Sequence, residues 1–373
     1  MIAERRGLDG FTDDLARQRT YFQGRSAVLE QVVGHLYDVF SEASRDARLA
    51  KVRDRLTEAW KPRHFPAAYD RPLLLLACLR LDAMTDGERH PLWSALAAAA
   101  PDPERATRSA VIQSMDPMRW KFWENVAHRA VQTNETSRAV AWLWPALLAG
   151  CSNGERALAL VDIGASAGLN LVADEVPAVW KRDDGSNLAI AQAVRTTVRL
   201  GLDAKPVSLA DPDSVAWLRA CVWAGDAERI ARLDAAIEAF RHPANSERPP
   251  RVETSQAHGV PARLRSLSAV QPPGGLVLAF QTVMRQYLDS ASSAAYESGM
   301  REWLASLAPG RGLWVELESA ADGDGAYPAS IVAHLHAGSG QIQSLLLGRC
   351  EYHPRVVKVN DANADALSVL ARA

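Results

Sequence analysis

The chain has 373 residues, of which 48% are hydrophobic and 23% are charged, a composition typical of a globular protein and not of a disordered or fibrous one. Its length exceeds that of a usual single domain, so we expect two domains or one domain with a large extension. The 42 basic residues nearly balance the 44 acidic residues, and the net charge of −2 gives no overall basic field for nucleic acid.

The cysteines and the amino terminus indicate a cytoplasmic protein. The four cysteines lie far apart without C-x-x-C spacing, which predicts reduced and buried thiols. The first 20 residues mix acids with bases and lack the apolar core of a secretory signal. The longest apolar run, residues 73–79, is far shorter than the roughly 20 residues that span a bilayer, so no membrane association is expected.

The first part of the chain, up to about residue 148, has helical periodicity. Between residues 28 and 40, apolar side chains recur at i, i+3, i+4 and i+7 spacing, which is typical of an amphipathic core helix. Pro62 and Pro66 interrupt the pattern, and residues 101–103 mark another loop. We therefore expect an all-helical amino-terminal domain at residues 1–155.

From residue 156 onward, strand-like runs alternate with helices. Continuous apolar strands separated by helices predict an α/β domain, residues 156–373, with a mostly parallel sheet covered on both faces. Residues 337–340 have the length of a hairpin turn, so the sheet is expected to end in an antiparallel strand. The expected strands are 158–163, 196–202, 251–256, 276–280, 313–317, 331–335 and 342–347, with helices around 215–240 and 294–307.

The first strand-like run ends in an acid and a bend of small residues, Asp162-Ile163-Gly164-Ala165-Ser166-Ala167-Gly168. Small side chains let a ligand lie against the backbone, and a helix is expected from about Leu169. The glycine spacing differs from the G-x-G-x-x-G pattern that places a pyrophosphate at a helix N-terminus. A carboxylate at Asp162 would repel a pyrophosphate and suit a ligand that carries an ammonium and a sulfonium.

This motif resembles motif I of class I S-adenosylmethionine methyltransferases, in its D-x-G-A-S-x-G form. The resemblance implies a Rossmann-like methyltransferase-type sheet and S-adenosylmethionine as cofactor. It also implies acids or amides at the ends of the next three strands, with Asp203 on the ribose, Gln256 near the adenine and Gln281 beside the methyl group. The residues implied to bind the cofactor are Asp162, Gly164, Ala165, Ser166, Gly168, Asn170, Asp203, Gln256 and Gln281.

Two plainer alternatives remain open at this point. The bend is also explained as a tight strand-to-helix turn that binds nothing, and Asp203 as an ordinary loop aspartate. The N/D-P-P-Y/F motif of many amino-methylating enzymes is missing after the fourth strand, where the chain reads Phe280-Gln281-Thr282. This lowers the expectation of base or glutamine methylation.

Several segments resemble DUF2332, a bacterial family to which no activity is assigned. They are residues 132–138, 162–171, 201–206 and 217–223, and the resemblance extends over most of the chain. The resemblance indicates family membership and implies no reaction.

The segment Gln132-Thr133-Asn134-Glu135-Thr136 places several hydrogen-bonding groups just before the apolar residues 139–148. Because buried amides and carboxylates need partners, the segment is expected at a polar junction or in a cleft. We predict Glu135 as a substrate-side acid or base, with Gln132, Asn134 and Arg138 as substrate-binding residues. The alternative is that Thr133 or Asn134 caps a helix while Glu135 and Arg138 form a local pair.

The histidines are weaker candidates for functional residues. His128 precedes Gln132 by four residues and is a candidate general base on the same helix face. His334 and His336 alternate in a strand-like run and His353 follows, but without a placed carboxylate they do not predict a metal site.

Taken together, the sequence predicts an S-adenosylmethionine-dependent methyltransferase that acts on a small molecule or peptide, with the helical domain covering the substrate. Methyl transfer depends chiefly on orientation and desolvation of the reactants. The alternative is a catalytically silent nucleoside-binding or regulatory protein of the same fold. A nicotinamide-dependent oxidoreductase is disfavoured by the glycine spacing. The oligomeric state is not determined by the sequence.

Overall fold

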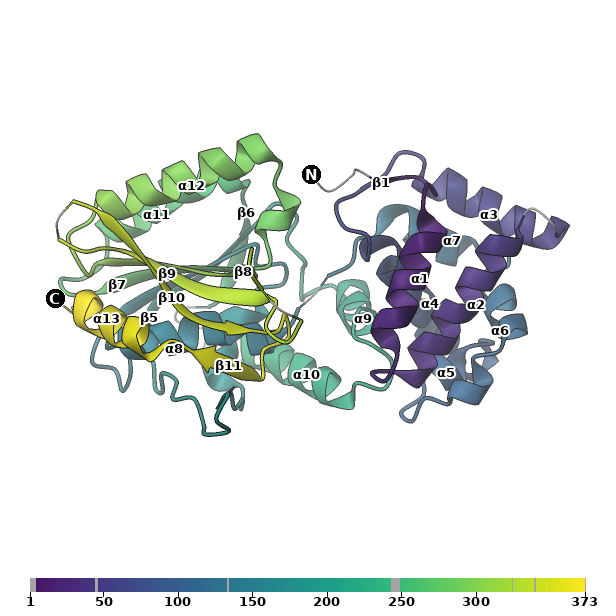
Figure 1. Ribbon diagram of the computed structural model, residues 1–373, viewed down its shortest axis with the longest axis horizontal. Coiled ribbons are helices and arrows are strands. Elements are labelled where there is room, and N and C mark those ends of the chain that lie inside the picture. The colour runs from purple at the N-terminus through teal and green to yellow at the C-terminus, as the bar shows by residue number, and fades with distance from the viewer. Residues whose placement is uncertain are drawn as a thin grey trace. The chain divides into compact units, whose positions relative to one another are not determined.

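The chain folds into two compact units in the computed structural model, which describes residues 5–43, 46–132, 134–242, 249–323, 325–338 and 340–372 (Figure 1). Unit 1 comprises Met1–Thr133 and Ala210–Ala231, and unit 2 comprises Asn134–Leu209 and Arg232–Ala373. The boundary suggested by the sequence falls between residues 155 and 156, whereas residues 134–155 pack in unit 2.

Unit 1 is built mainly of helices around one apolar core. The apolar stripe of α2 (Ala27–Glu42) is buried as expected, and the Ser26 side chain caps this helix by accepting a hydrogen bond from the Leu29 amide. The short strands β1 (Arg5–Arg6) and β2 (His64–Phe65) form an antiparallel pair. The helices are α1 (Phe11–Phe22), α2 (Ala27–Glu42), α3 (Ala47–Trp60), α4 (Asp70–Asp86), α5 (Trp93–Leu96), α6 (Arg108–Ser114), α7 (Trp120–His128) and α9 (Pro212–Ala220).

Unit 2 contains a mixed sheet that is nine-stranded in the described residues. Its strands are β3 (Leu158–Ile163), β4 (Lys181–Arg182), β5 (Thr196–Asp203), β6 (Arg251–Thr254), β7 (Leu276–Thr282), β8 (Gly312–Ser319), β9 (Ala329–His336), β10 (Ile342–Cys350) and β11 (Val356–Val359). Their order in the sheet is β4-β11-β10-β9-β8-β7-β3-β5-β6. The strands from β6 to β8 pair in parallel, whereas β8, β9, β10 and β11 pair antiparallel in turn. All seven expected runs form strands. They correspond to β3, β5, β6, β7, β8, β9 and β10, whereas the sequence did not predict β4 or β11.

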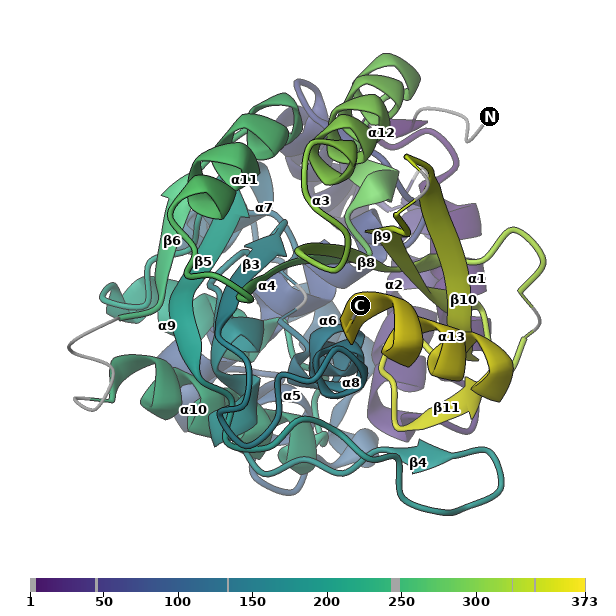
Figure 2. The ribbon, with the colours of Figure 1, turned by 90° about the vertical axis from the view of Figure 1, so that its left-hand side faces the viewer.

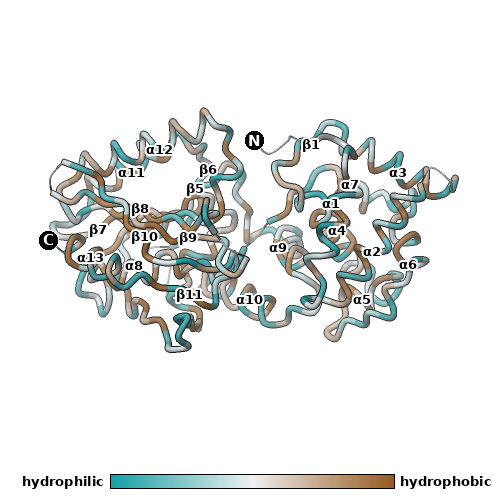
Figure 3. Tube along the Cα trace, viewed as in Figure 1, coloured by the Kyte–Doolittle hydropathy of each residue, from teal (hydrophilic) through white to brown (hydrophobic). Residues whose placement is uncertain are grey.

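Helices cover both faces of this sheet (Figure 2). Alternate residues of β3 enter different cores: Val161 packs in the core with residues of α11 (Val260–Ala269) and α12 (Ser290–Ala305), and Leu160 in the core with residues of α8 (Val140–Leu148) and α13 (Asp361–Arg372). Figure 3 shows how apolar residues concentrate along the central strands and α8. Because α8 is buried in the core of the sheet, residues 134–155 belong with unit 2.

The connection from β3 to β5 differs from the prediction. A 3-10 helix, η4 (Leu169–Glu175), replaces the expected α-helix, and Val172 interrupts it with a φ of −115°. Pro177 follows closely, and the preceding Val176 is extended, as residues before proline prefer. Consequently no long helix directs its N-terminus at the bend.

The expected helical region around residues 215–240 forms two helices, α9 and α10 (Ala227–Arg241), separated at Gly225, which has a φ of 86°. The four cysteines form no disulfide, and all except the half-buried Cys221 are buried. In the described residues, no helix combines the length and the apolar character that a membrane span requires.

Candidate functional site

The candidate site lies at the carboxyl end of β3, where the strand order reverses direction. From β3 the chain adds β5 and β6 on one side of the sheet, and later β7 and β8 on the other. In open α/β sheets, ligands bind beyond the carboxyl ends of the strands at such a reversal. The bend of residues 164–168 occupies this position.

Small residues let the bend pack closely against its neighbours. Gly164, Ser166 and Gly168 have φ values of 77°, 52° and 76°, in the left-handed region. A Cβ atom at Gly168 would lie 2.7 Å from Cγ2 of Val252, and one at Gly164 would lie 2.8 Å from Cγ of Met284. Part of the space beside the bend is therefore filled by protein atoms, although Gly164 itself remains exposed.

We expect Gly168→Ala to lower the free energy of unfolding by about 1–3 kcal/mol, because it combines an unfavourable φ with overpacking. Urea unfolding measures the change. Gly185→Ala is a matched control, since Gly185 has a φ of 86° and no atom within 4 Å of an added Cβ. Equal losses in the two variants would show that close packing at Gly168 contributes nothing.

Asp162 is the most unusual side chain of the site. It is only 2% exposed, and its Oδ2 atom has no hydrogen-bond partner among the described residues. Burial, with a smaller contribution from the nearby Asp203 carboxylate, raises the pKa of Asp162 to about 8. The carboxyl group is therefore mostly protonated at neutral pH and is available to a donor that enters the site.

Asp203 connects β5 to the bend. Its Oδ2 accepts a hydrogen bond from the Ser166 amide at 2.8 Å, and its Oδ1 accepts one from the Lys205 amide at 2.7 Å. The residue thus fixes the bend, and each oxygen keeps a second lone pair for another donor.

The polar segment that begins at Asn134 reaches the same bend. The Asn134 amide donates to Oγ of Ser166 at 3.2 Å and accepts from the Ala167 amide at 3.5 Å. The structure therefore brings together two motifs that are about 30 residues apart in the chain. Thr133 lies outside the described residues.

Glu135 is buried beside Asn134 and holds three donors. Its Oε1 accepts from the Ser137 amide at 3.1 Å and from Arg232 at 3.3 Å. Its Oε2 lies 3.2 Å from Nδ1 of His353. Glu135 is also the N-cap of η3 (Thr136–Ala139), whereas the alternative interpretation of the segment had Thr133 or Asn134 as the cap. Arg138 is largely buried and donates to the Tyr352 carbonyl at 2.9 Å.

Further unsatisfied polar atoms occur near these elements. Oδ1 of Asn170 on η4 and Oγ of Ser137 on η3 are buried without a partner among the described residues. The two short helices pack against each other. Since buried polar groups are usually paired, such atoms indicate a place for water or a ligand.

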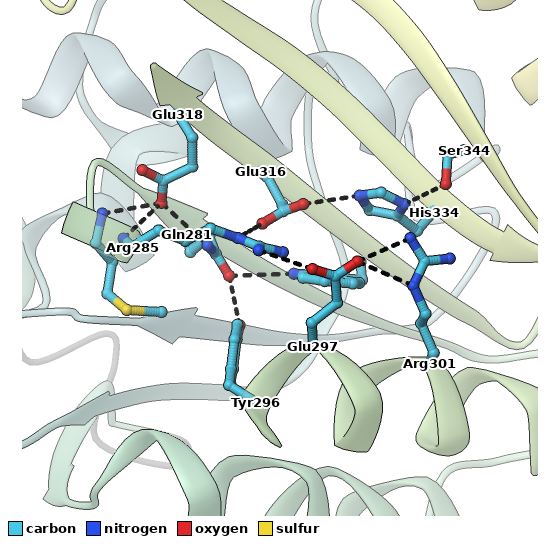
Figure 4. A network of polar contacts seen from close by, with 11 residues as sticks. Gln281, Arg285, Tyr296, Glu297, Arg301, Glu316, Glu318, His334 and Ser344 are labelled. Carbon is cyan, nitrogen blue, oxygen red and sulfur yellow. Dashed lines mark hydrogen bonds and ion pairs between the residues drawn. The ribbon is translucent and has the colours of Figure 1, made fainter. Parts of the chain in front are cut away.

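In the described residues no hydrogen bond joins Asp162 to Gln281 or Gln256, although Gln281 pairs in the sheet with the neighbouring Ile163. Gln281 points to the α12 side of the sheet, where it donates to Glu318 at 3.0 Å and accepts from Trp314 at 3.2 Å and from Tyr296 (Figure 4). Gln256 is exposed after β6. A polar groove of about 340 Å³ beside it is lined by Leu202, Thr254, Ser255, Gly259 and Arg263, among others.

His128 and Gln132 belong to unit 1, so they are not part of the arrangement found within unit 2. No group of three or more histidine, cysteine or acidic residues suited to a metal occurs in the described residues.

Sequence reasoning missed the carboxylate partners of two histidines: Glu135 lies beside His353, and Glu316 lies 2.9 Å from His334. The alternation of side chains along a strand predicts that His334 and His336 point to the same face of the sheet, but it does not predict which residues of neighbouring strands lie beside them.

Comparison with known proteins identifies the family. A family model described as "Uncharacterized protein conserved in bacteria (DUF2332)" matches residues 26–359. No curated protein and no solved structure matches the chain. The match includes the bend, the Asn134–Arg138 segment and most of both units, but not α1 or α13. The chain therefore belongs to the DUF2332 family.

Proposed function

We propose that unit 2 binds S-adenosylmethionine at the carboxyl end of β3, and that the protein is an S-adenosylmethionine-dependent methyltransferase acting on a small molecule or peptide. The observation that carries this proposal is the buried and unpartnered Oδ2 of Asp162 beside the bend. An unpaired buried carboxyl group is costly to stability, and a cationic ligand offsets this cost by supplying donors and charge.

The strand order supports a Rossmann-like, methyltransferase-type sheet. The parallel strands β6-β5-β3-β7-β8 follow the order 3-2-1-4-5 of doubly wound sheets that bind nucleotides. The next strand, β9, is antiparallel. The short η4 does not supply the helix N-terminus on which a pyrophosphate rests, which argues against a dinucleotide.

The residues present suit the amino-acid end of this cofactor. Its ammonium group has three donors, and Asp162 and Asn170 both hold buried oxygen atoms that lack donors. Asp203 would accept from ribose hydroxyls through its remaining lone pairs. When bound, S-adenosylmethionine supplies an electrophilic methyl group.

The chain itself positions a proton acceptor. Glu135 already accepts hydrogen bonds from Ser137 and Arg232, so its Oε1 atom is engaged by the protein itself. His353 is 31% exposed in its side chain and is oriented by Glu135 through Nδ1. We assign His353 the role of accepting a substrate proton, with Glu135 as its positioning residue.

A second candidate is a catalytically silent nucleoside-binding or regulatory protein. The packing of Met284 against Gly164 favours it, because this side chain fills space beside the bend. Both candidates predict ligand binding, and they differ in whether methyl groups are transferred.

Calorimetry tests the binding step. We expect S-adenosylhomocysteine to bind with micromolar affinity and Asp162→Ala to weaken it by about 10–100-fold, the effect of losing one charged hydrogen bond. Asp184→Ala is the matched control, since Asp184 is exposed and pairs only near the surface. Absence of binding to the unchanged protein, or tighter binding of NADH, would overturn the proposal.

Transfer of labelled methyl groups to a metabolite or peptide extract then separates the two candidates. Label incorporation that His353→Asn reduces supports the methyltransferase. Binding of S-adenosylhomocysteine without any incorporation supports the silent protein.

A further inference from the structure

A serine, a histidine and a glutamate form a hydrogen-bonded chain on the α12 side of the sheet (Figure 4). Oγ of Ser344 lies 2.7 Å from Nδ1 of His334, and Nε2 of His334 lies 2.9 Å from Oε2 of Glu316. His334 is 5% exposed and Glu316 is 9% exposed. Ser344, by contrast, is exposed. The hydrogen-bonded series of side chains thus extends from a buried acid to a solvent-exposed hydroxyl group.

The antiparallel pairing of three strands creates this arrangement. Trp314 on β8 pairs with His334 on β9, which pairs with Ser344 on β10, so the three side chains share one face. Glu316 lies two residues beyond Trp314 on that face. A change of register by one residue would move His334 to the opposite face and disrupt these hydrogen bonds.

The imidazole of His334 is held on several sides. Its ring lies against the Trp314 ring with centroids 4.4 Å apart. Glu316 accepts from Nε2 through one oxygen, while its other oxygen pairs with Nε of Arg285 at 2.5 Å. Arg285 also pairs with Glu297 of α12. The acid is therefore fixed before any substrate arrives.

This geometry determines which nitrogen serves as the base. In the neutral imidazole, Nε2 of His334 carries the proton because it faces the acceptor Glu316, and Nδ1 then presents its lone pair to the Ser344 hydroxyl. A nucleophile within hydrogen-bond reach of a base, with that base oriented by an acid, is the arrangement of an activated serine. A purely structural network would not require its terminal hydroxyl to be exposed.

We propose that Ser344 is a nucleophile activated by His334 and Glu316, and that this surface hydrolyses activated acyl esters. Oγ of Ser344 forms a bond to the acyl carbon while its proton passes to Nδ1 of His334. The bond from the acyl carbon to the leaving oxygen breaks, and that oxygen takes the proton from His334. Water then attacks the acyl-serine by the same route, which releases the acid and restores the Ser344 hydroxyl. This site is independent of the proposed cofactor site.

Labelling of the full chain with a fluorophosphonate probe, read by peptide mass spectrometry, tests the proposal. We expect modification at Ser344 and hydrolysis of p-nitrophenyl acetate, both lost in Ser344→Ala. His334→Gln should slow labelling at least about 100-fold, the usual contribution of a general base. Ser298 is the matched control: it is exposed and hydrogen-bonds to Glu302 at 3.1 Å, without a histidine in that bond. Ser298→Ala should change neither the rate of labelling at Ser344 nor the rate of p-nitrophenyl acetate hydrolysis.

Two results would overturn the proposal. One is a folded, unchanged protein in which Ser344 stays unlabelled or reacts no faster than Ser298. The other is equal labelling of Ser344 with and without His334. Circular dichroism of each variant shows whether a loss reflects unfolding, and Ser344→Ala, at an exposed position, is expected to keep the native spectrum.

Discussion

Replacing Arg71 by methionine is expected to lower the free energy of unfolding by about 3–5 kcal/mol, the cost of removing one partner from a buried ion pair. Arg71 on α4 is completely buried and contacts Asp14 on α1, which is 1% exposed. Its Nε and Nη2 atoms lie 2.9 Å and 2.5 Å from Oδ2 of Asp14. The guanidinium also donates to the carbonyls of Gly7 and Asp9, both at 2.9 Å.

The large loss has a specific origin. Methionine fills a similar volume, but it leaves the Asp14 carboxylate and two carbonyl groups without these donors. Urea unfolding followed by circular dichroism measures the difference. Arg108→Met is the matched control, because Arg108 pairs with Glu42 at 2.7 Å where both side chains are at least 41% exposed, and exposed pairs contribute under about 1 kcal/mol.

The double replacement Asp14→Leu with Arg71→Met sharpens this test. It removes both charges together, so it should recover much of the stability lost in the single variant. If Arg71→Met and Arg108→Met cost the same, the buried pair does not have the importance assigned to it here.

The second large effect concerns the pH dependence of stability in Asp162→Asn. The folded protein keeps a proton on Asp162 up to a pKa of about 8, whereas this carboxyl ionises near its ordinary value of 3.8 when unfolded. Between these values the folded state holds more protons, so stability falls as pH rises, by up to about 1.4 kcal/mol per pH unit. From pH 5 to pH 7 this group alone removes about 3 kcal/mol.

Asparagine does not ionise, so Asp162→Asn should lack this contribution. The unfolding free energies of the two proteins, measured at pH 5, 6 and 7, should diverge in favour of the variant as pH increases. Titrating groups remote from Asp162 act equally in both proteins and cancel in the difference. Asp184→Asn, at an exposed position, should follow the unchanged protein. Parallel curves for Asp162→Asn would contradict the raised pKa.

These two buried acids illustrate a difference between structural and functional burial. Asp14 receives two hydrogen bonds from Arg71 at its Oδ2 atom, which suits a role in holding α1 to α4. Asp162 has an oxygen without a partner and therefore costs stability in the absence of a ligand. Residues that lower stability without a compensating contact are expected at functional sites.

Local sequence patterns determined seven of the nine described strands of unit 2 and the position of its bend. Continuous apolar runs such as residues 158–163 mark strands buried on both faces, because each side chain must be accommodated in one of two cores. Small residues after Asp162 correctly indicated a tight bend, and the structure adds that three of its residues have left-handed backbone. The prediction was wrong at Leu169. An α-helix was expected there, but a short 3-10 helix forms, which is interrupted at Val172 and ends before Pro177.

Only the tertiary structure determined which polar groups meet. Asn134 contacts Ser166, Glu135 contacts His353 and Glu316 contacts His334, across separations of 32, 218 and 18 residues. Periodicity shows which face of a strand or helix is buried, but it does not specify the neighbouring strand or its register. Strand order and register depend on packing of the whole sheet, and they place these side chains within hydrogen-bond distance.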